Sequence, residues 1–336
     1  MRRFLLPALL GAALLSAAPP GYHVLRKIHL GGDGSWDYLT ADPSARRLYL
    51  SHSTHVMVLD LDTEKVVGDI PDTQGVHGIA IASELNRGFI SDGRTNDVTV
   101  FDLQTLKTIG KVPAGTNPDA ILYDPASKRV FAFNGHSNSA TVIDAASSSV
   151  LTTIPLPGAP EFAATDTAGK VFVNIADKGQ VAEIDSHKMT VTAVHSIAPC
   201  EDPSGMAIDV AHHRLFSGCG NRMMAVLDVS SGKVMATPPV GAGVDGNGFD
   251  PGTGFAFSAN GADGTLTVVG ESGGKFQVLE TVPTQRGART MTIDLKTHNI
   301  YLPTGEFGPA PPPTADNPHP RRTILKDSFT LVVVGR

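Results

Sequence analysis

The feature that most constrains this chain is a repeat of about 42 residues that runs through nearly its whole length. Each copy holds four short runs of β-type residues separated by turn residues. In the copy that begins at Thr116 these runs cover 120–123, 129–133, 140–143 and 150–154. A single four-stranded sheet cannot bury both of its faces, so each unit must pack against its neighbours. The repeat therefore predicts one array, although a length of 336 residues usually indicates two domains.

Two anchor positions recur with this period. The first ends the first run of each unit and is Asp in all but one: Asp42, Ala82, Asp124, Asp166, Asp209, Asp250 and Asp294. The second closes the third run: Asp60, Asp102, Asp144, Asp185 and Asp228. The anchors define seven units, with first strands expected near residues 37, 77, 119, 161, 205, 246 and 289. Four strands per unit at this period are typical of propeller blades, so the sequence predicts an all-β, seven-bladed β-propeller.

The two ends of the chain predict how the ring closes. Residues 23–29 form one more β-type run with no partner strands before the first unit. The last unit ends at Arg336 directly after its third strand and lacks a fourth. We expect 23–29 to supply that outer strand, because closure removes exposed sheet edges. The propeller domain is then 21–336, with a proline-rich insertion at about 306–327 in the last unit.

The N-terminus and the cysteines indicate export. Two arginines precede an apolar run and small residues, which predicts a secretory signal peptide over 1–18 and a periplasmic or secreted protein. An uncleaved anchor is the alternative, although no other apolar run approaches membrane length. The two cysteines, Cys200 and Cys219, are expected to form a disulfide in an exported protein, the alternative being two buried thiols.

Composition narrows the range of partners. Charged residues make up 18% of the chain, the formal net charge is −6, and no basic block occurs. Binding to a nucleic acid backbone requires clustered Lys and Arg, so no nucleic acid partner is expected. After signal cleavage no transmembrane span remains in this interpretation, and we expect a monomer.

The units resemble the YVTN-repeat β-propeller family, the YncE-like exported proteins. The resemblance rests on VFVN at Val171–Asn174, FAFN at Phe131–Asn134 and VTVFD at Val98–Asp102, and it covers about residues 35–336. It implies the propeller fold and export. It implies no reaction, because the family consists mostly of exported proteins without an assigned one, and the chain contains no characterised catalytic motif.

One face of the predicted propeller collects the loops that enter the first strands and those that follow the second strands. Its polar residues differ from unit to unit, and varied polar groups that converge on one mouth are typical of a ligand site. Acids outnumber bases there, which favours a cation over a phosphate. The candidate ligand-binding residues are Trp36, Asp37, His77, Arg94, Asp119, His136, Glu161, Asp202, Arg222, Arg289 and Glu306.

Three histidines suggest a sharper possibility. His52, His77 and His136 occupy comparable positions at the mouth of the first three units, and with Asp37 or Asp119 they could hold a divalent metal such as Zn²⁺. The alternative is that each histidine makes a hydrogen bond between blades. The leading functional hypothesis is a binding or scaffold module for a small ligand or a protein segment at the mouth. The competing hypothesis is a metal-dependent enzyme for lactone or ester hydrolysis, or a redox step, at the same mouth.

Overall fold

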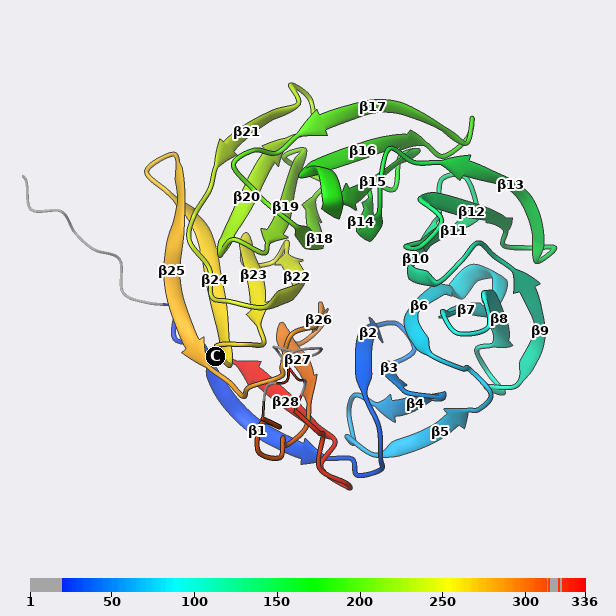
Figure 1. The fold of residues 1–336 in the computed structure, drawn as a ribbon, viewed down its shortest axis with the longest axis horizontal. Helices are drawn as coiled ribbons and strands as arrows, with labels where there is room; N and C mark the ends of the chain where they lie inside the picture. Colours follow the sequence, from blue (N-terminus) through cyan, green and yellow to red (C-terminus); the bar gives the residue numbers. More distant parts are fainter. Residues whose placement is uncertain (1–19, 313, 315–319, 321) are drawn as a thin grey trace, which may run out of the picture.

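The computed structural model describes residues 20–312, 314, 320 and 322–336. The predicted signal peptide, 1–18, lies outside these residues, as does part of the proline-rich insertion. The described residues form seven four-stranded antiparallel sheets around a central axis (Figure 1). The prediction of an all-β, seven-bladed propeller is therefore confirmed.

Each blade runs outward from an innermost strand. The innermost strands are β2 (Trp36–Asp42), β6 (Val76–Ala82), β10 (Pro118–Asp124), β14 (Pro160–Thr165), β18 (Pro203–Asp209), β22 (Val244–Asp250) and β26 (Thr292–Asp294). The second strands are β3 (Arg47–His52), β7 (Arg87–Asp92), β11 (Arg129–Asn134), β15 (Lys170–Ile175), β19 (Arg214–Cys219), β23 (Phe255–Asn260) and β27 (Asn299–Thr304).

The third strands are β4 (His55–Asp60), β8 (Asp97–Asp102), β12 (Ser139–Asp144), β16 (Gln180–Asp185), β20 (Met223–Asp228), β24 (Thr265–Ser272) and β28 (Thr330–Gly335). The outer strands are β5 (Val66–Ile70), β9 (Thr108–Pro113), β13 (Ser149–Pro155), β17 (Thr190–Ser196), β21 (Lys233–Ala236), β25 (Lys275–Pro283) and β1 (His23–His29). Two short 3₁₀ turns, η1 (Ser83–Leu85) and η2 (Ala176–Lys178), complete the elements.

The N-terminal strand closes the ring as the sequence predicts. β1 pairs antiparallel with β28, with His23 opposite Gly335 and His29 opposite Thr330. The last sheet therefore has the order β1-β28-β27-β26, and the blue first strand lies beside the red last strand in Figure 1. The first and last strands thus share one blade, between the sixth blade and the first.

The core lies between the blades. Each second strand contributes one aromatic ring that is at most 2% exposed: Tyr49, Phe89, Phe131, Phe172, Phe216, Phe257 and Tyr301. These rings belong to seven hydrophobic clusters, each of which joins two adjacent blades among the described residues. Because burying such a ring contributes about 1.5–3 kcal/mol, the packing of neighbouring blades stabilises the ring as a whole.

The recurring anchor aspartates cap turns. Asp102 Oδ1 accepts hydrogen bonds from the backbone N–H groups of Gln104 (3.0 Å) and Thr105 (2.7 Å). Asp60 does the same for Asp62 and Thr63. Short polar side chains satisfy turn donors in this way, so the same residue is favoured in blade after blade. These turns lie on the face opposite the loops that enter the innermost strands.

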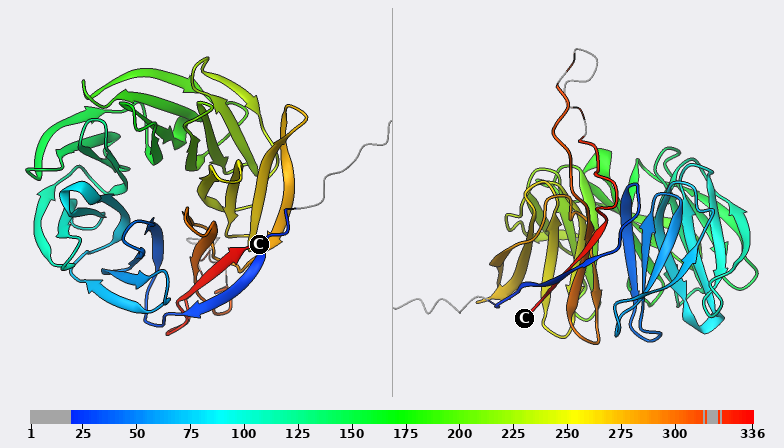
Figure 2. Two further views of the ribbon diagram at one scale, coloured as in Figure 1. Left: turned by 180° about the vertical axis from the view of Figure 1, so that it is seen from behind. Right: turned by 90° about the horizontal axis from the view of Figure 1, so that it is seen from below.

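The proline-rich insertion between β27 and β28 rises from one face of the disc (Figure 2). Its described base is a two-stranded ribbon in which Gly308 N–H donates to Thr323 O and Leu325 N–H donates to Glu306 O, each at 2.8 Å. Phe307 in this ribbon packs edge-on against Trp36, with ring centroids 6.0 Å apart. The insertion therefore stands on the junction of the first and last blades, on the mouth face.

Candidate functional site

One side chain from each blade forms a ring at the mouth end of the innermost strands. Each lies five residues before the first anchor, and together they are called the channel ring here: Asp37, His77, Asp119, Glu161, Ser204, Asp245 and Arg289. All seven are partly exposed, whereas the residue before each of them is buried. The innermost strands surround the axis in Figure 1, and hydrogen bonds or ion pairs join neighbouring ring positions from Ser204 through Asp245, Arg289, Asp37 and His77 to Asp119.

One arc of the channel ring is a hydrogen-bonded chain centred on Arg289. The Ser204 hydroxyl donates to Asp245 Oδ1 at 2.7 Å. Arg289 Nε donates to Asp245 Oδ2 at 2.8 Å, and its Nη2 lies 3.4 Å from Asp37 Oδ1. The same nitrogen donates to the Trp36 carbonyl at 2.8 Å. Arg289 therefore neutralises part of the charge of Asp245 and fixes the orientation of Asp37.

The next arc joins three potential metal ligands. His77 Nδ1 lies 2.6 Å from Asp37 Oδ2 and 3.7 Å from Asp119 Oδ1. One ligand atom from each of the three lies within 4.8 Å of the others, and no other group of His, Cys, Asp and Glu in the described part of the chain does this. Burial lowers the pKa of His77, but the hydrogen bond to Asp37 and the charge of Asp119 outweigh it and raise that pKa to about 9.

Burial and crowding favour the protonated form of the remaining acids of the ring. Burial, then the charges of Asp119 and Asp245, raise the pKa of Glu161 to about 8. Burial also raises the pKa of Asp119 to about 7, against the opposing effect of His77, and raises that of Asp245. Among the described residues, no hydrogen bond or ion pair involves the Glu161 carboxylate. The ring thus contains four carboxyl groups and only two basic groups, one guanidinium and one imidazolium.

An aromatic pair bounds the channel ring on the side away from the mouth. Tyr38 follows Asp37 in β2 of the first blade, and its ring packs edge-on against Phe162 of the fourth blade at 4.9 Å. It belongs to the hydrophobic cluster between the third and fourth blades, so its side chain crosses the axis. Burial, with the charge of Asp119 adding to it, raises the pKa of Tyr38 well above its usual range. The Tyr38 hydroxyl therefore stays protonated, and the side chain lies on the side of the carboxylates that faces away from the mouth.

The other predicted site residues lie apart from the ring. Trp36 is 3% exposed and stacks on Phe329 at 5.9 Å, so it supports the insertion instead of lining an open rim. His52 is 1% exposed and stacks on Phe329 at 4.3 Å, and burial lowers its pKa to about 4. His136 is exposed. Of the three candidate metal-binding histidines, only His77 belongs to the cluster of potential ligands.

Four further candidates are exposed on the mouth face: Arg94, Asp202, Arg222 and Glu306. Arg222 forms an ion pair with Asp263 at 2.8 Å, and this pair holds the guanidinium at the surface. Asp202 is the one of the four whose charge reaches the ring, because it contributes to the raised pKa of Glu161. The structure therefore brings together Asp37, His77, Asp119, Glu161 and Arg289, with Asp202 beside them.

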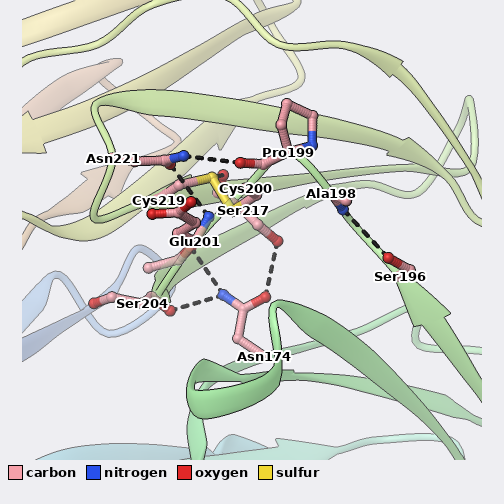
Figure 3. The surroundings of a disulfide bond; sticks show 11 residues. Asn174, Ser196, Ala198, Pro199, Cys200, Glu201, Ser204, Ser217, Cys219 and Asn221 are labelled. Carbon is pink, nitrogen blue, oxygen red and sulfur yellow. Dashed lines mark hydrogen bonds between the residues drawn. A yellow bond between two sulfur atoms is a disulfide. The ribbon is translucent and has the colours of Figure 1, made fainter.

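A disulfide and a cleft lie next to the ring on the same face. Cys200 and Cys219 are bonded, with Cα atoms 5.4 Å apart, which confirms the predicted bridge (Figure 3). Asn221 tightens the bridged segment, since its Nδ2 donates to Pro199 O at 2.8 Å and its Oδ1 accepts from Glu201 N–H at 3.2 Å. A cleft of about 610 Å³ between the fourth and fifth blades borders the disulfide and is lined by Glu201 and Asp202.

Sequence reasoning missed Ser204, Asp245, Tyr38 and Phe162 as members of the site. Ser204 and Asp245 could have been found by counting back five residues from each anchor, because that position faces the axis in every blade. Tyr38 and Phe162 give no such signal. Their contact joins the first and fourth blades across the axis, and no sequence spacing reports a contact of that kind.

Comparisons with known proteins show the fold alone. No protein-family model matches the chain, and no curated protein matches it, so membership of the YVTN-repeat family stays a prediction. Among solved structures, the chain is similar to one from Kuenenia stuttgartiensis hydrazine synthase, with a TM-score of 0.72 and 15% identity. That match covers 82% of this chain and 94% of the other. In the described part of the chain no helix is long and apolar enough to cross a membrane.

Proposed function

We propose that this protein is an exported binding module that takes a small cationic ligand at the channel ring. The observation that carries the proposal is the crowding of four carboxyl groups around two basic groups in the ring. Glu161 has no cationic partner among the described residues, and its pKa of about 8 reflects burial beside other carboxylates. Like charges that share a site raise one another's pKa, and a bound cation relieves that repulsion.

The surroundings suit a small ligand that enters from one side. Tyr38 and Phe162 bound the ring on the side away from the mouth, and the cleft at Glu201 and Asp202 opens on the mouth face. Three acids, Asp177, Glu201 and Asp202, and one base, Lys178, line the cleft, so its local field favours cations over anions. Export agrees with the Cys200–Cys219 disulfide, because such bonds persist in oxidising compartments.

The test is a calorimetric titration of the purified protein with a panel of cations and anions. We expect 1:1 binding of small cations, probed with putrescine and Zn²⁺, affinity that falls as salt is raised, and no binding of phosphate or citrate. Glu161→Gln should weaken putrescine binding about tenfold, which corresponds to about 1.4 kcal/mol. Glu84→Gln, on the opposite face, is the matched control and should have no effect. Absence of cation binding, or binding that Glu161→Gln leaves unchanged, would overturn the proposal.

The competing function, a metal-dependent enzyme, is favoured by one observation: the proximity of Asp37, His77 and Asp119. A catalytic zinc site commonly uses three protein ligands and leaves a fourth position for water or substrate. Enzyme activity therefore requires first that these three residues hold a metal.

A further inference from the structure

We propose that Asp37, His77 and Asp119 bind a divalent first-row transition metal. The inference rests on the proposed function, since it names the cation that one arc of the channel ring takes. The three residues come from equivalent positions of the first three blades, so the rigid innermost strands β2, β6 and β10 set their spacing.

The geometry is close to that of a bound ion. Zn²⁺ binds nitrogen and oxygen ligands at about 2.0–2.1 Å, which separates tetrahedral ligands by about 3.3 Å. The observed separations from His77 Nδ1 are 2.6 Å to Asp37 Oδ2 and 3.7 Å to Asp119 Oδ1, and all three ligand atoms lie within 4.8 Å. An ion therefore requires shifts of about 1 Å, within the reach of side-chain rotation.

One potential ligand atom of this group lacks a hydrogen-bond partner. Asp119 Oδ1 is buried and has no hydrogen-bond partner in the described part of the chain. Leaving a buried acceptor unpaired is unfavourable, and more so when the group is charged. This is the oxygen that lies 3.7 Å from His77 Nδ1, so an ion bound to the imidazole would also satisfy it.

Neighbouring residues hold the ligands in place. Arg289 Nη2 lies 3.4 Å from the second oxygen of Asp37, and the Asp37 N–H donates to Ser51 Oγ at 2.8 Å. Gly93 leaves the room that His77 occupies, because a Cβ there would lie 2.6 Å from His77 Nε2. Partners of this kind orient metal ligands and affect affinity nearly as much as the ligands do.

The donor set selects the class of metal. One imidazole nitrogen with two carboxylate oxygens suits Zn²⁺, Fe²⁺ or Mn²⁺ and contains no thiolate for softer ions. Ca²⁺ prefers six to eight oxygen ligands, and Mg²⁺ keeps most of its waters, so neither competes well for this set.

The test compares Zn²⁺ binding, measured by calorimetry and by metal content after dialysis, in the wild type and in matched variants. We expect one tight site, a loss of affinity of about 100-fold in His77→Gln or Asp119→Asn, and no change in His136→Gln, which removes an exposed histidine of the same face. Melting curves establish that each variant is folded. Ca²⁺ at the same concentration should not displace Zn²⁺.

Two results separate failure of the metal site from failure of the proposed function. Putrescine binding that depends on Glu161, together with Zn²⁺ binding that His77→Gln leaves unchanged, would overturn the metal site and keep the cation-binding module. Absence of binding by both probes would overturn both.

Discussion

Carboxyl groups lie both at the anchor positions and in the channel ring, at opposite ends of the innermost strands, and their surroundings differ. The anchor aspartates on the face away from the mouth accept hydrogen bonds from turn backbone; at Asp102 the Thr105 N–H is the main cause of a pKa below the usual range, and at Asp144 it is the Ser147 N–H. In the channel ring, burial and crowding raise the pKa of Asp119 to about 7 and of Glu161 to about 8. The same chemical group is thus fully paired at one end and underpaired at the other.

The difference follows from what each position has to do. Every blade needs the same turn, so an aspartate recurs at the anchor with little variation. The ring position differs in each blade and reads Asp, His, Asp, Glu, Ser, Asp and Arg. A purely structural role would favour repetition at the ring as it does at the anchors. In this propeller the regular position builds the fold, and the irregular position at the other end of the same strands is the one we propose for binding.

The largest expected effect on stability is at an anchor. The Asp294 carboxylate is fully buried. It accepts hydrogen bonds from Arg46 Nη1 at 2.8 Å and from the Lys296 N–H at 3.1 Å. Arg46 also pairs with Asp62 at 2.9 Å, but Asp294→Ala removes the acceptor of Arg46, of the Lys296 N–H and of the Thr297 hydroxyl. Together these losses should lower the free energy of unfolding by about 4 kcal/mol in urea denaturation. Cation binding by the remaining folded protein should not change. A large loss of cation affinity would show that the anchor positions and the channel ring do not have separate roles.

Removing the disulfide should have the next largest effect. Cys200 and Cys219 are separated by 19 residues. Closing a loop of that size contributes about 3 kcal/mol by restricting the unfolded chain. A Cys200→Ser, Cys219→Ser double variant should lose this amount in denaturant titration and still bind putrescine at the ring. A stability equal to that of the wild type would show that the bridge adds nothing to the mouth face.

Asp92 tests whether a buried carboxylate on the mouth face lowers the stability of the fold. It lies at the end of β7, where the third and sixth blades have Asn134 and Asn260, and burial raises its pKa to about 7. The folded state holds this proton more tightly than the unfolded chain, so stability should fall as pH rises from about 4 to 7. Asp92→Asn should therefore gain about 2 kcal/mol above pH 7 and nothing below pH 4.

Melting curves of the wild type and Asp92→Asn across this pH range provide the check. The amide can donate to Thr99 Oγ1, which now donates to Asp92 Oδ2, as Asn134 donates to Thr141 and Asn260 to Thr267. Equal stability of the two proteins at pH 8 would mean that Lys111, 3.4 Å from Asp92, compensates the charge fully.

The smallest expected effect is on the ring itself. Glu161→Gln removes a carboxyl group that has no cationic partner among the described residues, so it should leave the melting temperature unchanged or slightly higher while weakening putrescine binding about tenfold. Measured together, stability and affinity should change in opposite directions. A clear loss of stability in this variant would show that Glu161 stabilises the fold, as the anchor aspartates do.

Most of the fold could be predicted from the sequence because its determinants are local and repeated. The anchor aspartates, the second-strand aromatics and the unpaired run at 23–29 led to seven blades and to the closing strand. The site was predictable only in part. The repeat places Asp37, His77 and Asp119 at strand entries. The grouping of His52 with His77 depends on loop packing, and His52 is buried in a stack on Phe329.

The most direct measurement is anomalous diffraction at the zinc edge from crystals grown with Zn²⁺ and the purified protein. We expect a peak on the axis side of β2, β6 and β10, within bonding distance of Asp37, His77 and Asp119 and lost in His77→Gln crystals. A map with no peak at the channel ring, or with zinc only at exposed histidines such as His136, would contradict it.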